Sequence, residues 1–261
     1  LAFEAESAAL PETPLEGWWR APHATWQDIA YEEDGAVGTL HFAFYNGAMS
    51  TRQCQRLQAA LAWAQQRPTR VLVLAGGPDF WSNGIHLNVI EAASLGDGSA
   101  ADESWDNINA MNDLTLELIQ TPGQLTVAAL GGNAGAGGCF LARAADQVWV
   151  RSGVMLNPHY KNMGNLYGSE YWTYLLPKRV GLDQAQAIMR NREPLTAQAS
   201  VALGLYDACL EGERAAFVGQ HDIRRVAFLQ SLEIRPRQGT VIFIEEGPVW
   251  HVDVLFPMRR R

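Results

Sequence analysis

Two apolar segments each run directly into a glycine-rich turn, and this repeated arrangement restricts the possible fold more than any other feature. Residues 71–77 lead into GGPDFWSNGIHL (residues 76–87), and residues 125–130 lead into GGNAGAGGCFLA (residues 131–142). A short apolar run that ends at glycine is typical of a strand buried on both faces. Neither turn is a P-loop or a GxGxxG motif.

Glycine allows the backbone of such turns to approach a ligand closely. Two turns that lie side by side can point two amide N–H groups at one oxygen atom. This arrangement is an oxyanion hole, in which one donor contributes about 3–4 kcal/mol in well-studied enzymes. The alternative is tight packing of strand on helix without chemistry, and the pattern alone leaves both interpretations open.

The remaining periodicity alternates strands with helices. Capping residues and apolar spacing predict strands at residues 36–44 and 147–150, and helices at residues 50–66, 102–120, 169–176, 183–189 and 196–203. Alternation of this kind predicts an α/β layered fold with mainly parallel strands and flanking helices.

The composition narrows the classes of partner. The formal net charge is −8 at pH 7, whereas nucleic-acid binding requires a basic surface. Cys54, Cys139 and Cys209 are odd in number and far apart, which is neither a disulfide framework nor a zinc spacing. The sequence contains no HExxH motif and no clustered ligands. We therefore expect reduced thiols, a cytoplasmic protein, no metal and no nucleic acid.

The longest apolar segment, residues 125–142, is not expected to cross a membrane. Its glycines and Asn133 are better explained by a buried strand, a turn and a buried helix. The N-terminal residues are acidic and include prolines, without the positive start and apolar stretch of a signal peptide. No membrane partner is therefore expected.

Groups that can move protons are concentrated in residues 157–171, NPHYKNMGNLYGSEY. This stretch holds three tyrosines, one histidine, one lysine and one glutamate. Such side chains act as general acids and bases when they lie within hydrogen-bond distance of a reacting atom. The alternative is a polar turn without a catalytic role.

The glycine-rich turns resemble those of the crotonase superfamily of enoyl-CoA hydratases and isomerases. The resemblance lies in WSNGIHL (residues 81–87), AGAGGCFLA (residues 134–142) and PLTAQASVALGLYD (residues 194–207). It covers roughly residues 30–230 and implies a crotonase-like fold that binds a CoA thioester. The thioester oxygen would lie between the amides of Ile85 and Gly137.

The same resemblance implies which residues of the first turn contact CoA. The adenine end would lie near Ser82 and Asn83, Gly84 would belong to the same binding turn, and His86 would touch the pantetheine. His86 replaces the acid that usually stands in the family's FSAGADL phrase.

Departures from the family argue against ordinary enoyl-CoA hydration. Hydratases of this superfamily use two glutamates to position and activate water. These glutamates would fall at Phe140 and His159 of this chain. A phenylalanine cannot transfer protons, so a typical hydratase is not expected.

A narrower resemblance is to the C-terminal domain of the HypX/HoxX family of nickel–iron hydrogenase maturation factors. It rests on GGPDFWSNGIHLNVIEAA, NAGAGG and above all NPHYKNMGNLYGSEYWTYLLP. In that family an N-terminal formyl-tetrahydrofolate domain passes a formyl group to CoA. The crotonase-like domain then splits formyl-CoA into CO and CoA, and the CO becomes a ligand of the hydrogenase iron. The resemblance implies that this chain, which starts at Leu1, lacks the N-terminal domain.

Within this interpretation, Tyr160 and Glu170 are the first candidates for proton transfer, and His159 is the third. Glu170 would act as the base, with a pKa raised by burial. Tyr160 would donate to the leaving sulfur or hold the formyl oxygen. Each residue also has an alternative role. Glu170 could be an acid in the first turn of a helix capped by Ser169, favoured by the helix dipole. Tyr160 could be a packed tyrosine, and His159 a structural histidine that orients Tyr160.

We expect three regions: residues 1–29 as a linker or N-terminal arm, residues 30–231 as the CoA-binding domain, and residues 232–261 as a divergent tail. The tail alternates like strands instead of showing the helical, basic sequence that the resemblance implies, which leaves homo-oligomer contacts open. Two other functions also remain open. One is another crotonase-type acyl-CoA isomerase or hydrolase that uses Glu170, and the other is a non-catalytic CoA-binding domain.

Overall fold

The main sheet contains six strands in the order β1-β2-β4-β7-β9-β12. The computed structural model describes residues 17–20, 27–96, 98–160, 167–212, 240–246 and 249–255. The strands are β1 (Ile29–Asp34), β2 (Val37–Phe42), β4 (Val71–Ala75), β7 (Leu125–Leu130), β9 (Gln147–Arg151) and β12 (Ala208–Leu210). All neighbours are parallel except β1 and β2. The predicted α/β fold with mainly parallel strands is confirmed.

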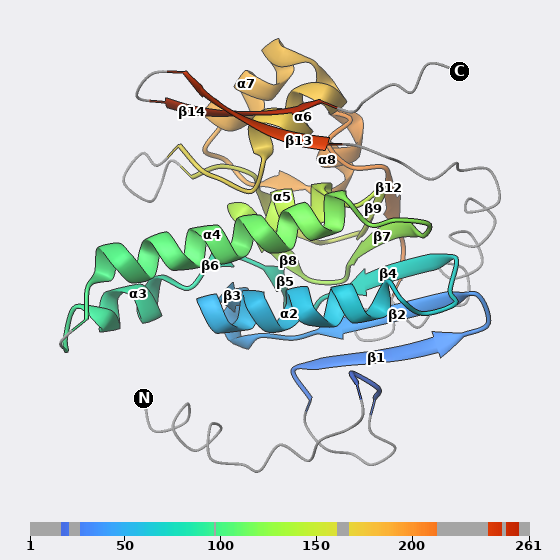
Figure 1. The fold of residues 1–261 in the computed structure, drawn as a ribbon. Coiled ribbons are helices and arrows are strands. Elements are labelled where there is room, and N and C mark those ends of the chain that lie inside the picture. The colour runs from blue at the N-terminus through green and yellow to red at the C-terminus, as the bar shows by residue number, and fades with distance from the viewer. Residues whose placement is uncertain are drawn as a thin grey trace.

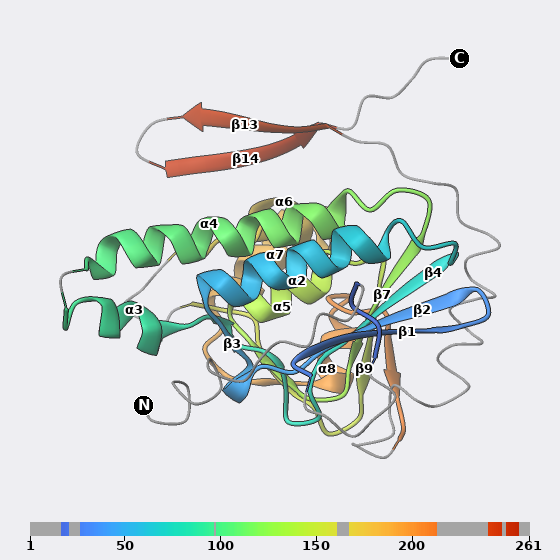
Figure 2. The same cartoon turned by 60° about the horizontal axis from the view of Figure 1, so that its bottom comes forward.

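Two long helices, α2 (Thr51–Ala64) and α4 (Ala100–Ile119), pack side by side next to this sheet (Figures 1 and 2). Both helices bury apolar side chains in the core, with Leu57 of α2 and Leu114 of α4 both at 0% exposure. Helix α2 begins as predicted, because Ser50 and Gln53 form a reciprocal capping box.

A smaller sheet grows out of the glycine-rich turns. Its order is β11-β10-β8-β5, with β5 (Phe80–Ser82), β8 (Asn133–Gly135), β10 (Met155–Asn157) and β11 (Leu195–Thr196). The short strand β3 (Ala48–Met49) also pairs with β6 (Gly84–Ile85). Because β5 and β8 are parallel neighbours, the two turns lie beside each other. The sequence predicted the turns but not the strands within them.

The later helices lie where the sequence predicts them, but the helix predicted at residues 169–176 is shifted at both ends. The predicted start of a helix at residue 169 is wrong, because α6 (Trp172–Val180) has Tyr171 as its N-cap, in the left-handed conformation. Helices α7 (Leu182–Arg190) and α8 (Ala197–Ala202) lie where expected, and Thr196 caps α8 through the amide of Ala199. The remaining helices are α3 (Leu87–Ala93) and α5 (Gly137–Arg143).

The C-terminal alternation corresponds to an antiparallel hairpin of β13 (Thr240–Glu246) and β14 (Val249–Leu255). Residues 1–16, 21–26 and 213–239 lie outside the described residues, so the three-region division stays a prediction. Among the described residues, none of the helices combines the length and the apolar character that a membrane span needs.

Candidate active site

The two glycine-rich turns meet backbone to backbone. Gly84 has φ +80°, and a Cβ atom placed on it would lie 3.1 Å from the amide nitrogen of Gly137. Gly137 opens helix α5 and is buried, while Ile85 follows Gly84 and is half-buried. The structure therefore brings the turns of Ile85 and Gly137 together, as an oxyanion hole requires.

The second turn is held in a strained conformation. Ala136, the N-cap of α5, has φ +44° and ψ −125°, a region that residues with a Cβ atom rarely occupy. Its amide donates to the carbonyl oxygen of Asn157 at 2.8 Å. Strain of this kind persists where the surroundings enforce it, and it is concentrated at functional sites.

The predicted CoA contacts of the first turn also hold that turn in place. Ser82 is fully buried, and its hydroxyl accepts from the amide of Gly84 at 3.1 Å. The Asn83 side chain donates to the carbonyl oxygen of Asn46 at 2.7 Å. His86 caps α3 through its Nδ1 atom, which accepts from the amide of Val89. Direct contact of Ser82, Asn83, Gly84 and His86 with CoA stays a prediction.

Tyr160 and Glu170 form a buried pair beside the second turn. The Tyr160 hydroxyl donates to Oε2 of Glu170 at 2.5 Å. The two residues are 6% and 2% exposed. A Cβ atom placed on Gly137 would lie 2.3 Å from Oε1 of Glu170, so the carboxylate packs directly against the predicted oxyanion hole. The two predicted halves of the site are therefore in contact.

The surroundings of the pair perturb both of its titratable groups. Burial raises the pKa of Glu170 above its ordinary value, and the hydrogen bond from Tyr160 partly opposes this shift. Burial and the nearby Glu170 carboxylate raise the pKa of Tyr160 well above 10. The tyrosine is therefore a neutral donor at physiological pH, and the raised pKa of the carboxyl group makes Glu170 a candidate for proton transfer.

The backbone around Glu170 adopts an unusual conformation. Glu170 and Tyr171 both have left-handed φ values, +53° and +54°, which cost about 1–2 kcal/mol per residue with a side chain. The amide of Glu170 donates to Oδ1 of Asn112 at 2.8 Å. Helix α6 begins at Trp172 with Tyr171 as its N-cap, so Glu170 precedes the helix and is not the first-turn acid that a cap at Ser169 would make it. Its carboxylate faces Tyr160 instead.

The two positions where hydratases have glutamates offer no carboxylate. Phe140 is fully buried, and its ring stacks on that of Tyr160 with centroids 5.9 Å apart. The Nε2 atom of buried His159 lies 3.2 Å from the carbonyl oxygen of Arg192. Phe140 thus packs against one face of the Tyr160 ring. The catalytic role predicted for His159 stays a prediction.

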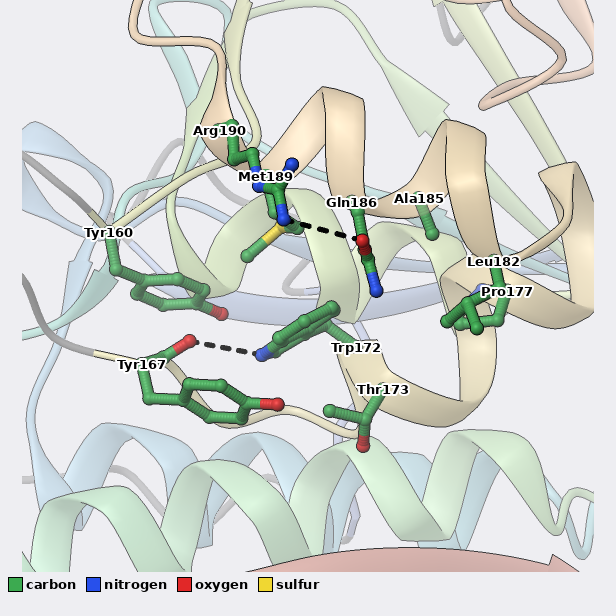
Figure 3. Close-up of a pocket in the computed structure, with 10 residues that line it drawn as sticks. All are labelled: Tyr160, Tyr167, Trp172, Thr173, Pro177, Leu182, Ala185, Gln186, Met189 and Arg190. Atoms are coloured by element: carbon green, nitrogen blue, oxygen red, sulfur yellow. Dashed lines mark hydrogen bonds between the residues drawn. The ribbon is translucent and has the colours of Figure 1, made fainter. Parts of the chain in front are cut away.

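A pocket of about 380 Å³ opens beside Tyr160. Figure 3 shows it between Tyr160 and the side chains of α6 and α7. The lining residues are Tyr160, Tyr167, Trp172, Thr173, Pro177, Leu182, Ala185, Gln186, Met189 and Arg190. Within the described part of the chain, no three His, Cys, Asp or Glu side chains are grouped as metal ligands.

Sequence reasoning missed the two asparagines on α4 that contact this site. Asn112 accepts from the amide of Glu170, and Asn107 accepts from the amide of His86 at 3.0 Å. The apolar spacing of α4 predicts a helix but does not indicate which polar residue on it meets a distant loop. Only the fold brings these pairs, 58 and 21 residues apart in sequence, into contact.

The chain is similar to known proteins in sequence and in fold. It is 54% identical over 214 residues to a hydrogenase maturation factor, HoxX, from Bradyrhizobium diazoefficiens, covering 82% of this chain and 36% of that protein. It is similar to a crystal structure of HypX from Aquifex aeolicus in complex with tetrahydrofolic acid, with a TM-score of 0.78 and 46% identity, covering 84% of this chain and 39% of that one. The chain therefore spans little more than a third of these relatives.

A crystal structure of enoyl-CoA hydratase from Bacillus halodurans shares the fold, with a TM-score of 0.69 and 18% identity, covering 80% of this chain and 82% of that one. The sequence model of the enoyl-CoA hydratase/isomerase family matches residues 37–221. This match includes both turns and the Tyr160–Glu170 pair. The chain belongs to the enoyl-CoA hydratase/isomerase family.

Proposed function

We propose that this chain splits formyl-CoA into carbon monoxide and CoA, and so supplies CO during hydrogenase maturation. The observation that carries the proposal is the buried Tyr160–Glu170 pair, packed against the turn of Gly137. The high identity to a hydrogenase maturation factor supports the pathway. Three free cysteines are consistent with action in the cytoplasm.

The proposed reaction needs only a base, an acid and a polarised carbonyl. The amides of Ile85 and Gly137 hold the formyl oxygen. The Glu170 carboxylate removes the formyl hydrogen as a proton, and the electron pair of the C–H bond stays on carbon as the lone pair of CO. The C–S bond breaks and its electron pair leaves with sulfur.

The proton then returns to the leaving group through the same pair. Tyr160 donates its hydroxyl proton to the thiolate, and Glu170 passes the abstracted proton to Tyr160 along their 2.5 Å hydrogen bond. Formyl-CoA thus becomes CO and CoA with no external oxidant, reductant or metal. Two proton transfers, from Tyr160 to sulfur and from Glu170 to Tyr160, return both residues to their starting states, which suits a site with one carboxylate and one phenol.

The proposed chemistry requires a one-carbon acyl group. Only a formyl thioester carries a hydrogen on its carbonyl carbon, so an acyl group with further carbons offers no proton whose removal would release CO. The Glu170 carboxylate lies against Gly137, and the ring of Phe140 stacks on that of Tyr160.

Incubation of the folded chain with synthetic formyl-CoA tests the proposal. We expect CO in the head space in equal amount to the free CoA formed, and no formate. Formate in place of CO would identify a hydrolase and overturn the proposal. Acetyl-CoA is the matched control and should not be cleaved. CoA binding measured by calorimetry, without turnover of any thioester, would favour a non-catalytic CoA-binding domain.

Family membership also makes enoyl-CoA hydration or isomerisation a second candidate. Because Phe140 and His159 occupy the places of the two hydratase glutamates, we expect no appreciable hydration of crotonyl-CoA. Loss of the enoyl-thioester absorbance at about 10 per second or faster, which is typical of enzymes, would contradict this expectation.

The partners follow from the same proposal. The relatives are longer than this chain, and one HypX structure contains tetrahydrofolic acid. We therefore propose that a formyl-tetrahydrofolate domain in the longer protein forms the formyl-CoA. The hydrogenase maturation machinery would then receive the CO. Assembly into a homo-oligomer stays a prediction.

A further inference from the structure

Helix α4 carries two asparagines that bond to two different parts of the candidate site. Asn107 is fully buried, accepts from the amide of His86 at 3.0 Å and donates to the carbonyl oxygen of Met49 at 2.9 Å. Asn112 accepts from the amide of Glu170 at 2.8 Å. One helix therefore bonds to the first glycine-rich turn at one point and to the Tyr160–Glu170 pair at another.

We propose that Asn112 is a positioning residue that orients the Glu170 carboxylate, through the backbone of Glu170, against the oxyanion hole. The proposal rests on the function proposed above and assigns the device that sets its geometry. Asn107 fixes the position of the first turn relative to the same helix. Five residues of helix separate the two asparagines by about 7.5 Å along the axis. Helix α4 thus sets the spacing between the first turn and the Tyr160–Glu170 pair.

The backbone conformation of Glu170 explains why such a device is needed. Glu170 and Tyr171 are consecutive left-handed residues, and a chain with side chains leaves that conformation unless its surroundings hold it. The hydrogen bond from the Glu170 amide to Asn112 holds the first of the two. Without it the peptide is free to return to an extended or right-handed conformation, and the carboxylate would turn away from Gly137.

An amide suits this position better than a carboxylate does. Several titratable groups already act on the pair, or on its neighbour Tyr171, from the elements around it. Cys54 of α2 interacts with Glu170, Cys139 of α5 interacts with Tyr160, and Asp113 of α4 acts on Tyr171. Asparagine supplies the acceptor without adding a further negative charge beside Glu170.

Two substitutions at this position separate positioning from folding. Asn112→Leu removes the acceptor at similar size. Asn112→Asp keeps an acceptor but adds a charge. Asn109→Leu is the matched control, since Asn109 lies on the same helix and, among the described residues, its side chain bonds to the carbonyl oxygen of Trp105 and not to the site. Each variant is compared for CO release, CoA binding and the infrared carboxyl band of Glu170, identified by its loss in Glu170→Gln.

We expect Asn112→Leu to lower kcat by about 10- to 100-fold, the effect of misplacing a reacting group by about 1 Å. KM and CoA affinity should change less than about twofold, and the Glu170 band should shift. At high pH, Asn112→Asp should keep more of the wild-type rate than Asn112→Leu does. The acid limb of its pH profile, where the rate falls as Glu170 is protonated, should move to higher pH, because added negative charge favours protonated Glu170. Asn109→Leu should match wild type in every readout.

The outcomes separate this inference from the proposed function. If wild-type protein releases no CO, the proposed function fails, and the infrared band alone decides the role of Asn112. A band and a kcat in Asn112→Leu equal to those of Asn109→Leu would overturn the inference. If Asn112→Leu does not fold, an unshifted band and an unshifted acid limb in Asn112→Asp would overturn it.

Discussion

The glycine-rich turns and the wall formed by Tyr160 and Glu170 touch each other but are built in different ways. The turns need only glycine, a strand and a helix start at Gly137. The wall needs two buried side chains and a left-handed Glu170 whose amide bonds to Asn112 on a distant helix. In the proposed function, the turns polarise the thioester and the wall decides what happens to the polarised group.

Gly137→Val attacks the contact between the two regions and should have the largest effect. The added Cβ would meet the Glu170 carboxylate at 2.3 Å, and it would also crowd the amide that we propose holds the thioester oxygen. We expect acyl-CoA binding by calorimetry and CO release to be lost together. Gly96→Val is the control, because a Cβ at Gly96 would have no neighbour within 4 Å among the residues that the structure describes.

A Gly137→Val protein that binds acyl-CoA normally but releases no CO would show that the turn serves only the wall. That result would remove Gly137 from the oxyanion hole. Circular dichroism confirms that each variant is folded before binding is measured.

Glu170→Gln attacks the wall alone. Glutamine keeps the size of the side chain and can accept from Tyr160, but it cannot remove the formyl proton. We expect CO release to fall by a factor of about 10²–10⁴, the usual range for a general base, with CoA affinity nearly unchanged. If CO release matches wild type while CoA still binds, the wall is not the reaction site, and His159 and His86 become the next candidates.

Tyr160→Phe sharpens the division of labour within the wall. Loss of the hydroxyl should lower CO release by about 10²–10⁴ with CoA affinity retained. A second effect separates it from Glu170→Gln. The hydrogen bond from Tyr160 opposes the rise in the pKa of Glu170, so its removal raises that pKa further.

The base must be ionised to act. As the pH is lowered, the residual activity of Tyr160→Phe should therefore begin to fall at a higher pH than the activity of wild type does. A pH profile of CO release measures this shift. Tyr45→Phe, at an exposed tyrosine, should leave both the rate and the profile unchanged. An acid limb that stays in place would mean that Tyr160 does not tune Glu170.

The sequence predicted the turns far better than the wall, for physical reasons. Strands β4 and β7 and the glycines after them depend on local signals, namely apolar runs and backbone freedom. Proximity of Tyr160 to Glu170 was also predictable, since ten residues separate them. Asn112 and the left-handed conformation of Glu170 were not, because both depend on contact with a helix 58 residues away. The wrong helix start at residue 169 has the same cause.

The last test concerns stability, where we expect the smallest effect. Burial raises the pKa of Glu170 in the folded protein, so folding favours the protonated form. This stabilisation is complete below the unfolded pKa of about 4.3 and is lost as pH rises through the folded value. Glu170→Gln stays neutral and should melt above wild type at pH 8, with the difference vanishing in acid. Each 1 kcal/mol corresponds to about 2–4 °C at this size.

The control is Glu91→Gln, at an exposed glutamate, which should not show this trend. A Glu170→Gln protein that is less stable than wild type at every pH would show that burial does not disfavour the ionised form of Glu170.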